Sequence, residues 1–126
     1  MPRNKIDFDT VRRIGLGFAG VEESTMYRSP ALKVRGKLLA CIAIHKSAEP
    51  GSLAVSVDFD QRAELMATAP DVYYLTDHYV NYPVVLVRLS RIHPDALPGL
   101  LHTAWRFMTA KTPGRKKGTT NVSPPR

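Results

Sequence analysis

The sequence has one cysteine and no long apolar run, and both deficits narrow what the protein can be. Cys41 is the single cysteine of the 126 residues, so it has no intrachain disulfide partner. It lies in the apolar run LLACIAI, where a cysteine is typically an unreactive core residue. No apolar run approaches the roughly 18 to 20 residues of a membrane span, and the polar start MPRNKIDFD is unlike a signal peptide. We therefore expect a soluble cytoplasmic protein without a membrane partner.

Motifs of catalysis and metal binding are missing as well. His45, His93 and His102 show no HxH or HExxH spacing, which argues against a zinc site. The sequence has no glycine-rich phosphate loop and no G-x-S-x-G elbow. Asp77 and His78 suggest a general base at first sight, but adjacent residues of a strand point to opposite faces. The sequence therefore predicts no enzymatic activity, no metal and no cofactor.

Acidic residues are absent from residues 111–126, KTPGRKKGTTNVSPPR, which hold five basic ones. The rest of the chain has 13 basic and 11 acidic residues, so most of the net charge of +7 lies in this tail. A segment of this composition cannot bury a core, and we expect a disordered tail after a single domain of residues 1–110. It is either a solubilising extension or a basic arm that binds phosphates through Arg115, Lys116 and Lys117.

Periodicity of the apolar residues predicts three helices and five strands. Asp7 is a plausible N-cap for the first helix, Asp60 for the second, and Pro70 ends the second. The residues Glu22 to Met26 are expected to form an irregular segment that leads into the sheet. Pro98 leaves two alternatives, a separate turn at residues 94–97 or a last helix that starts near Pro98. The predicted helices span 8–17, 61–69 and a C-terminal stripe from Leu97 to Met108, and the predicted strands span 31–35, 38–44, 53–59, 72–75 and 84–89.

The order helix, three strands, helix, two strands, helix predicts an α+β fold. Short connections favour an antiparallel sheet of about five strands in a two-layer sandwich, with the N- and C-terminal helices on one face. The other face should be at least partly open, and Trp105 should pack in the core. By phase, the open face is expected to hold Lys33, Arg35, Ser56, Asp58, Tyr74, Thr76, His78 and Arg88.

Several motifs resemble the MmcQ/YjbR family of small bacterial proteins over roughly residues 8–110. These motifs are Lys33-Val34-Arg35-Gly36-Lys37, Val57-Asp58-Phe59, Thr76-Asp77-His78-Tyr79, Tyr82-Pro83 and Arg88-Leu89. The resemblance implies a CyaY-like (frataxin-like) sandwich and DNA binding through a proposed double-wing arrangement. The chain departs from the family in Pro98-Gly99 and in its basic tail.

Two kinds of binding follow as hypotheses. In the first, the protein binds DNA with low sequence specificity, with cations on phosphates and aromatic rings on bases. In the second, a small-molecule-binding or protein-docking domain uses the same polar face, where Tyr74, His78 and Arg88 receive an anionic ligand. The candidate residues are Lys33, Arg35, Lys37, Tyr74, Thr76, His78, Tyr79, Tyr82 and Arg88.

Overall fold

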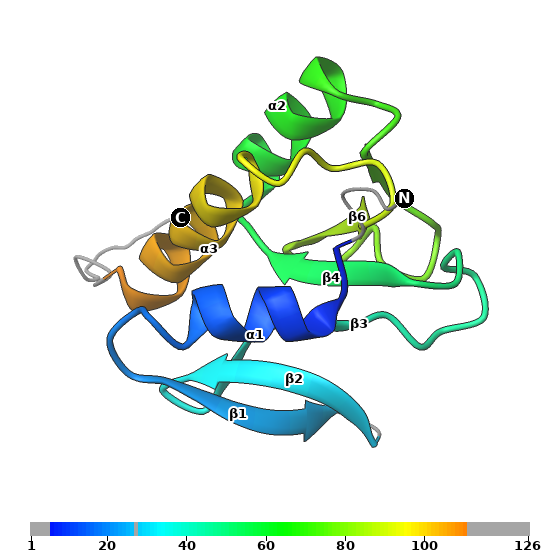
Figure 1. Ribbon diagram of the computed structural model, residues 1–126. Helices are drawn as coiled ribbons and strands as arrows, with labels where there is room; N and C mark the ends of the chain where they lie inside the picture. Colours follow the sequence, from blue (N-terminus) through cyan, green and yellow to red (C-terminus); the bar gives the residue numbers. More distant parts are fainter. Residues whose placement is uncertain (1–5, 27, 111–126) are drawn as a thin grey trace.

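The computed structural model describes residues 6–26 and 28–110 (Figure 1). The predicted tail, with Arg115, Lys116 and Lys117, lies outside the described residues. The elements follow in the order α1 (Phe8–Gly15), β1 (Val21–Met26), β2 (Ser29–Val34), β3 (Lys37–Ile42), β4 (Ser52–Ser56), α2 (Phe59–Thr68), β5 (Tyr73–Tyr74), β6 (Val84–Arg88) and α3 (Leu97–Thr109).

Within the described residues the strands form one antiparallel sheet of six strands in the order β1-β2-β3-β4-β6-β5. The α+β class and the antiparallel sheet are thus confirmed, with one strand more than expected. The prediction that Glu22 to Met26 is irregular was wrong, because these residues form the edge strand β1 and pair with β2. An edge strand with mostly exposed side chains shows little apolar alternation, so its sequence carries a weak signal.

Helix caps explain why other helix and strand boundaries differ from the predicted ones. The N-cap of α2 is Asp58, whose carboxylate accepts a hydrogen bond from the backbone N–H of Gln61 at 2.6 Å. The helix therefore begins at Phe59, so the predicted strand 53–59 was too long and the predicted cap Asp60 lies in the first turn. Residues 94–96 form a separate turn and α3 starts at Leu97 with Pro98 in its first turn, so each of the two alternatives holds in part.

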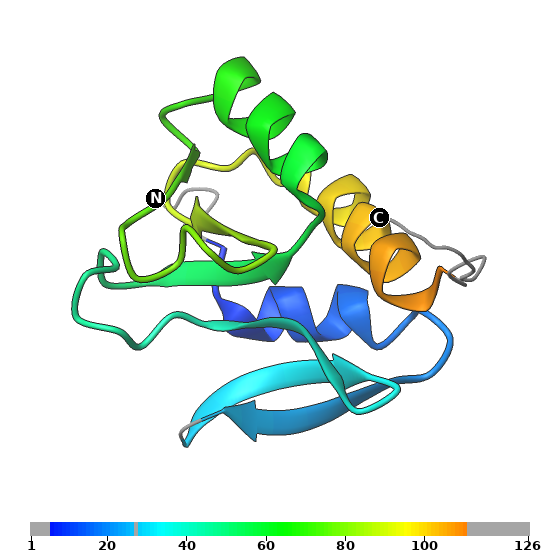
Figure 2. The same ribbon diagram turned by 180° about the vertical axis from the view of Figure 1, so that it is seen from behind.

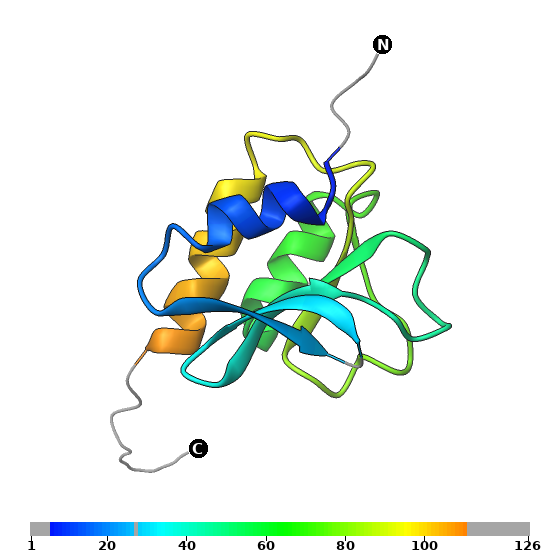
Figure 3. The ribbon, with the colours of Figure 1, turned by 60° about the horizontal axis from the view of Figure 1, so that its bottom comes forward.

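The core lies between the sheet and the layer formed by α1 and α3 (Figures 1 and 3). Every residue of the central strand β4 is buried. The indole of Trp105 packs against this core, as predicted, and donates a hydrogen bond to the carbonyl of Ala19 at 2.9 Å. Fully buried side chains from both layers include Val11, Leu32, Leu53, Val85 and Leu101.

The helix α2 occupies the end of the molecule opposite β1 (Figures 1 and 2). It contacts β5 and β6, and each of its residues is half-buried or exposed. Among the described residues, no helix combines the length and apolar character needed to cross a membrane.

Replacing Leu53 with alanine should destabilise the fold strongly, because this fully buried side chain of β4 touches the centre of the core. We expect a loss of about 2–5 kcal/mol in the free energy of unfolding, measured by urea titration. The control is Val80→Ala, at a side chain that is 42% exposed. A Leu53→Ala variant as stable as the control would contradict this account of the core.

Cys41 should resist modification in the folded protein. Its side chain is 6% exposed, and burial raises the pKa of the thiol to about 11. Because the thiolate is the reactive form, a thiol reagent at pH 8 should label the native protein slowly and the urea-unfolded protein fast. Equal labelling rates in the two states would show that Cys41 is accessible.

Candidate functional site

The sheet face opposite the helices carries a row of small and apolar side chains across four strands. Cross-strand register aligns Ala31, Cys41, Ala54 and Leu86, and all four are buried. Tyr74 and Tyr79 pack over this row, together with Met26, Leu38, Ala43 and Ala48. The segment of residues 75–83 that carries Tyr79 crosses this face (Figure 2). The expectation of an open polar face was therefore wrong for the centre of the sheet.

Arg88, at the end of β6, ties together three separate parts of the chain. Its Nε and Nη2 donate to the carboxylate of Glu49 at 3.0 and 2.8 Å. Its Nη1 donates to the carbonyls of Pro70 and Asp71 at 3.3 and 3.2 Å. The guanidinium also lies 4.2 Å from the ring centroid of Tyr74, in a cation–π contact. All three nitrogens are thus engaged within the protein, which leaves Arg88 poorly suited to the predicted role of phosphate or anion contact.

Tyr74 takes part in the same arrangement. Its hydroxyl accepts a hydrogen bond from the backbone N–H of Glu49 at 2.8 Å and shares one with the hydroxyl of Ser52 at 2.5 Å. The Ser52 side chain is buried, so this contact satisfies a polar group beneath the loop. Tyr74 therefore fixes the loop of residues 43–51 to the sheet, and its ring is covered by Arg88.

The loops of residues 43–51 and 75–83 meet through two histidines. The rings of His45 and His78 are stacked, with centroids 3.6 Å apart and an angle of 10° between planes. Nδ1 of His45 accepts a hydrogen bond from the backbone N–H of Ser47 at 3.0 Å, which favours the neutral ring protonated at Nε2. The pKa of His45 is lowered, first by burial and then by the charges of His78 and Lys46. The hydroxyls of Ser47 and Thr76 join the same loops at 2.8 Å.

Two tyrosines extend this contact. The ring of Tyr79 meets His78 edge-on at 4.8 Å, and the ring of Tyr82 lies 6.4 Å from His78. Tyr82 is 56% exposed and His78 is also exposed. The same loops expose the apolar side chains Ile44 and Val80. We call this set the loop surface, and it comprises the exposed residues Ile44, His78, Val80 and Tyr82 and the half-buried His45.

The three predicted cations of the hairpin formed by β2 and β3 lie elsewhere. Lys33 is on β2, four strands away from β5, or roughly 19 Å at the usual strand spacing. Nη1 of Arg35 donates to the carbonyl of Thr109 at the end of α3, on the helical side of the sheet. Lys37 is exposed at the start of β3. The predicted patch that joins Arg35 with Tyr74, His78 and Arg88 is therefore not formed.

The backbone conformation of the turn explains why Arg35 lies apart from the other predicted residues. Arg35 has a φ of 55° and Gly36 a φ of 76°, so the tight turn between β2 and β3 leaves the extended conformation. Alternation along a strand cannot assign a face to a residue in such a turn. Asp58, also expected on the open face, is the N-cap of α2.

Charge is balanced over the described part of the chain. Residues 6–26 and 28–110 contain eleven basic and eleven acidic side chains, so the excess positive charge belongs to the remaining residues. Within this described part, no group of three or more His, Cys, Asp or Glu side chains is arranged to hold a metal ion.

Sequence reasoning missed His45 and Glu49. His45 is 33 positions before its stacking partner His78, and Glu49 is 39 positions before Arg88. The proline and glycine at positions 50 and 51 predict the loop but not the segment that it faces. Only the pairing of β4 with β6 brings these loops together.

Replacing Glu49 with glutamine should make stability less dependent on pH. The hydrogen bond from Arg88, followed by its charge, lowers the pKa of the Glu49 carboxyl below its ordinary value of 4.5. A lowered carboxyl pKa stabilises the fold above the unfolded value, and this stability is lost as pH falls through the folded value. The wild type should therefore unfold at a higher temperature than Glu49→Gln at pH 7, and the difference should shrink as the pH falls below 4.5.

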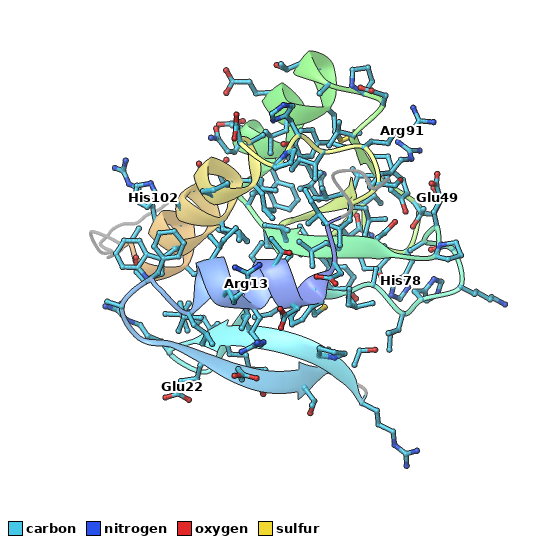
Figure 4. The ribbon with its side chains drawn as sticks, in the orientation of Figure 1. Arg13, Glu22, Glu49, His78, Arg91 and His102 are labelled. Carbon is cyan, nitrogen blue, oxygen red and sulfur yellow. The ribbon has the colours of Figure 1, made fainter. Side chains whose placement is uncertain are left out.

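Glu22→Gln is the control, because it removes a carboxylate from β1, far from Glu49 (Figure 4). A difference between the wild type and Glu49→Gln that stays constant from pH 7 to pH 3 would contradict the role given to the ion pair.

Comparison with known proteins agrees with this fold. Three uncharacterised mycobacterial proteins, among them Rv2570 of Mycobacterium tuberculosis and Mb2600 of Mycobacterium bovis, are 43% identical to the chain over 47 residues. The match covers 37% of this chain and only 36% of each relative. The crystal structure of the Deinococcus radiodurans protein DR2400, with a DUF419 domain, superposes with a TM-score of 0.70. It is 19% identical, and the match covers 88% of this chain and 84% of that protein, which shows a shared fold. The family model YjbR matches residues 16–107, and the chain therefore belongs to the YjbR family.

Proposed function

We propose that this protein binds single-stranded nucleic acid with low sequence specificity, and that the loop surface is where bases stack. The observation that supports the proposal most directly is the exposed pair of rings His78 and Tyr82, with centroids 6.4 Å apart. Exposed aromatic rings are the usual platform for unpaired bases, and stacking does not depend on base identity. This surface replaces the sheet face that the sequence suggested.

The loops hold the rings in fixed positions, which favours binding. The stack of His45 on His78 and the bond between Ser47 and Thr76 join the two loops before any ligand arrives. Arg88 fixes the first loop through Glu49. A surface ordered in advance loses less conformational entropy when it binds.

Positive charge for the phosphates comes from two sources under this proposal. Lys46 is exposed beside His45 on the first loop. The remaining charge belongs to residues 1–5 and 111–126, which hold seven basic and no acidic side chains. Binding that relies on such charges weakens steeply with salt.

A second candidate function is protein docking through the same loop surface. The balanced charge of the described residues and the exposure of Ile44, Val80 and Tyr82 favour it, because interface centres are poor in charge and rich in aromatic residues. The hypothesis of an anionic small ligand at Arg88 has less support, since Glu49 already occupies its donors.

A titration with a single-stranded oligonucleotide tests the proposal. Tyr82→Ala and His78→Ala should each weaken binding roughly 5- to 150-fold, because loss of a stacked base costs about 1–3 kcal/mol. Fluorescence anisotropy at several salt concentrations measures both affinity and salt slope. A chain that ends at residue 110 lacks five basic residues, and it should show a flatter slope but the same response to Tyr82→Ala.

His102→Ala is the matched control, because His102 is another exposed histidine in an aromatic stack, but on the helical layer (Figure 4). It should change the affinity less than twofold. If the full chain does not bind near physiological salt, or if the ring variants bind as the wild type does, the loop surface is not a nucleic-acid site.

A further inference from the structure

A cleft between α2 and α3 lies apart from the loop surface. It has a volume of about 290 Å³, close to the lower end of the range for small-molecule sites. Its walls come from α2, β5 and the start of α3, and its lining consists of Gln61, Leu65, Tyr73, Ala96, Gly99, Leu100 and Thr103. None of these seven side chains carries a charge, so the cleft offers no partner to an ionised ligand.

A buried tyrosine, Tyr73, lines this cleft, and its hydroxyl has no hydrogen-bond partner in the described part of the chain. Tyr73 is 7% exposed and points to the helical side of the sheet, whereas the next residue, Tyr74, points to the other side. Within residues 6–26 and 28–110, the Tyr73 hydroxyl makes no hydrogen bond to any side chain or backbone group. Buried tyrosine hydroxyls are normally paired, because an unpaired polar group in an apolar setting is costly.

The protonation state of this hydroxyl follows from its surroundings. Burial raises the pKa of Tyr73 above its ordinary value of 10.0, so the phenol keeps its proton at neutral pH. It therefore meets a ligand as a hydrogen-bond donor.

Gly99 leaves space where a side chain would stand. A Cβ atom built at this position has no atom within 4 Å, and the residue lines the cleft from the first turn of α3. Glycine is a poor helix residue, so its presence costs helix stability that alanine would recover. The opposite wall is α2, which rests on the sheet edge through few contacts and has no fully buried residue in its described length.

We infer that this cleft binds a small, uncharged, largely apolar molecule that carries one hydrogen-bond acceptor for the hydroxyl of Tyr73. The apolar part lies against Leu65 and Leu100, and the acceptor receives a hydrogen bond from the phenol O–H of Tyr73. The polar ends of Gln61 and Thr103 border the same cleft. This site does not depend on the proposed binding of nucleic acid.

Acetophenone and α-methylstyrene are matched probes, because they have nearly the same shape and only acetophenone carries a carbonyl acceptor. The ¹⁵N-labelled full chain is titrated with each probe at millimolar concentration, the range expected for so few atoms. Both probes should shift the amide resonances of residues that line the cleft, and acetophenone should bind more tightly. Benzoate, of similar size but charged, should produce no such shifts.

Two variants separate the parts of the site. Gly99→Leu fills the cleft with a residue that helices prefer to glycine, and it should abolish binding of both probes. Tyr73→Phe should weaken acetophenone roughly 2- to 10-fold, the usual effect of one neutral hydrogen bond, and leave α-methylstyrene unchanged. The control is Arg13→Leu, which introduces the same leucine side chain at an exposed site on α1. This variant should bind both probes as the wild type does.

Three results would overturn the inference. They are no shift at the cleft of the wild type, binding that survives Gly99→Leu, and a Tyr73→Phe variant that weakens both probes equally. The first shows that the cleft takes no ligand of this class, the second places the probes elsewhere, and the third removes the hydroxyl from recognition.

Discussion

The interaction on which the rest of the binding surface depends is the contact of Arg88 with Glu49 and Tyr74. Arg88 is the last residue of β6, which pairs with β4. Its guanidinium contacts both the loop of residues 43–51 and the backbone carbonyls that precede β5. An exposed ion pair alone contributes little to stability, but here a forked geometry, two backbone acceptors and an aromatic face act together. This contact holds the first loop where His45 meets His78. Arg88, which the sequence suggested as a ligand contact, therefore has a structural role.

The sheet is covered on both faces by different means, and this decides where a partner can bind. Helices α1 and α3 cover one face of the sheet. Tyr74 and the segment of residues 75–83, which includes Tyr79, cover the centre of the other face. Small side chains at Ala31, Cys41 and Ala54 let that segment lie close to the strands. What remains exposed is the outer side of the two loops, where His78 and Tyr82 stand. Recognition on loops supported by a rigid sheet is a common arrangement in binding proteins.

Much of the fold was predictable from the sequence, because it rests on local patterns. Alternation in β2, β3 and β4 and the apolar stripe of α3 each reflect one buried face. The edge strand β1 escaped detection because its polar residues bury little. Asp58 was assigned to the preceding strand, so the cap of α2 was assigned to Asp60. The candidate site was harder, since residue type identified His78, Tyr79 and Tyr82 but not their neighbours. His45 and Glu49 join them only through strand pairing, and Arg35 leaves them because of a left-handed turn.

The central claim is that a partner is recognised on the two loops and not on the strands or helices. The most direct measurement is a map of backbone amide shifts when the ¹⁵N-labelled full chain binds a single-stranded oligonucleotide. The account predicts that the largest shifts fall in residues 43–51 and 75–83. Shifts confined to α1, α3 or the hairpin of β1 and β2, with both loops unchanged, would contradict it.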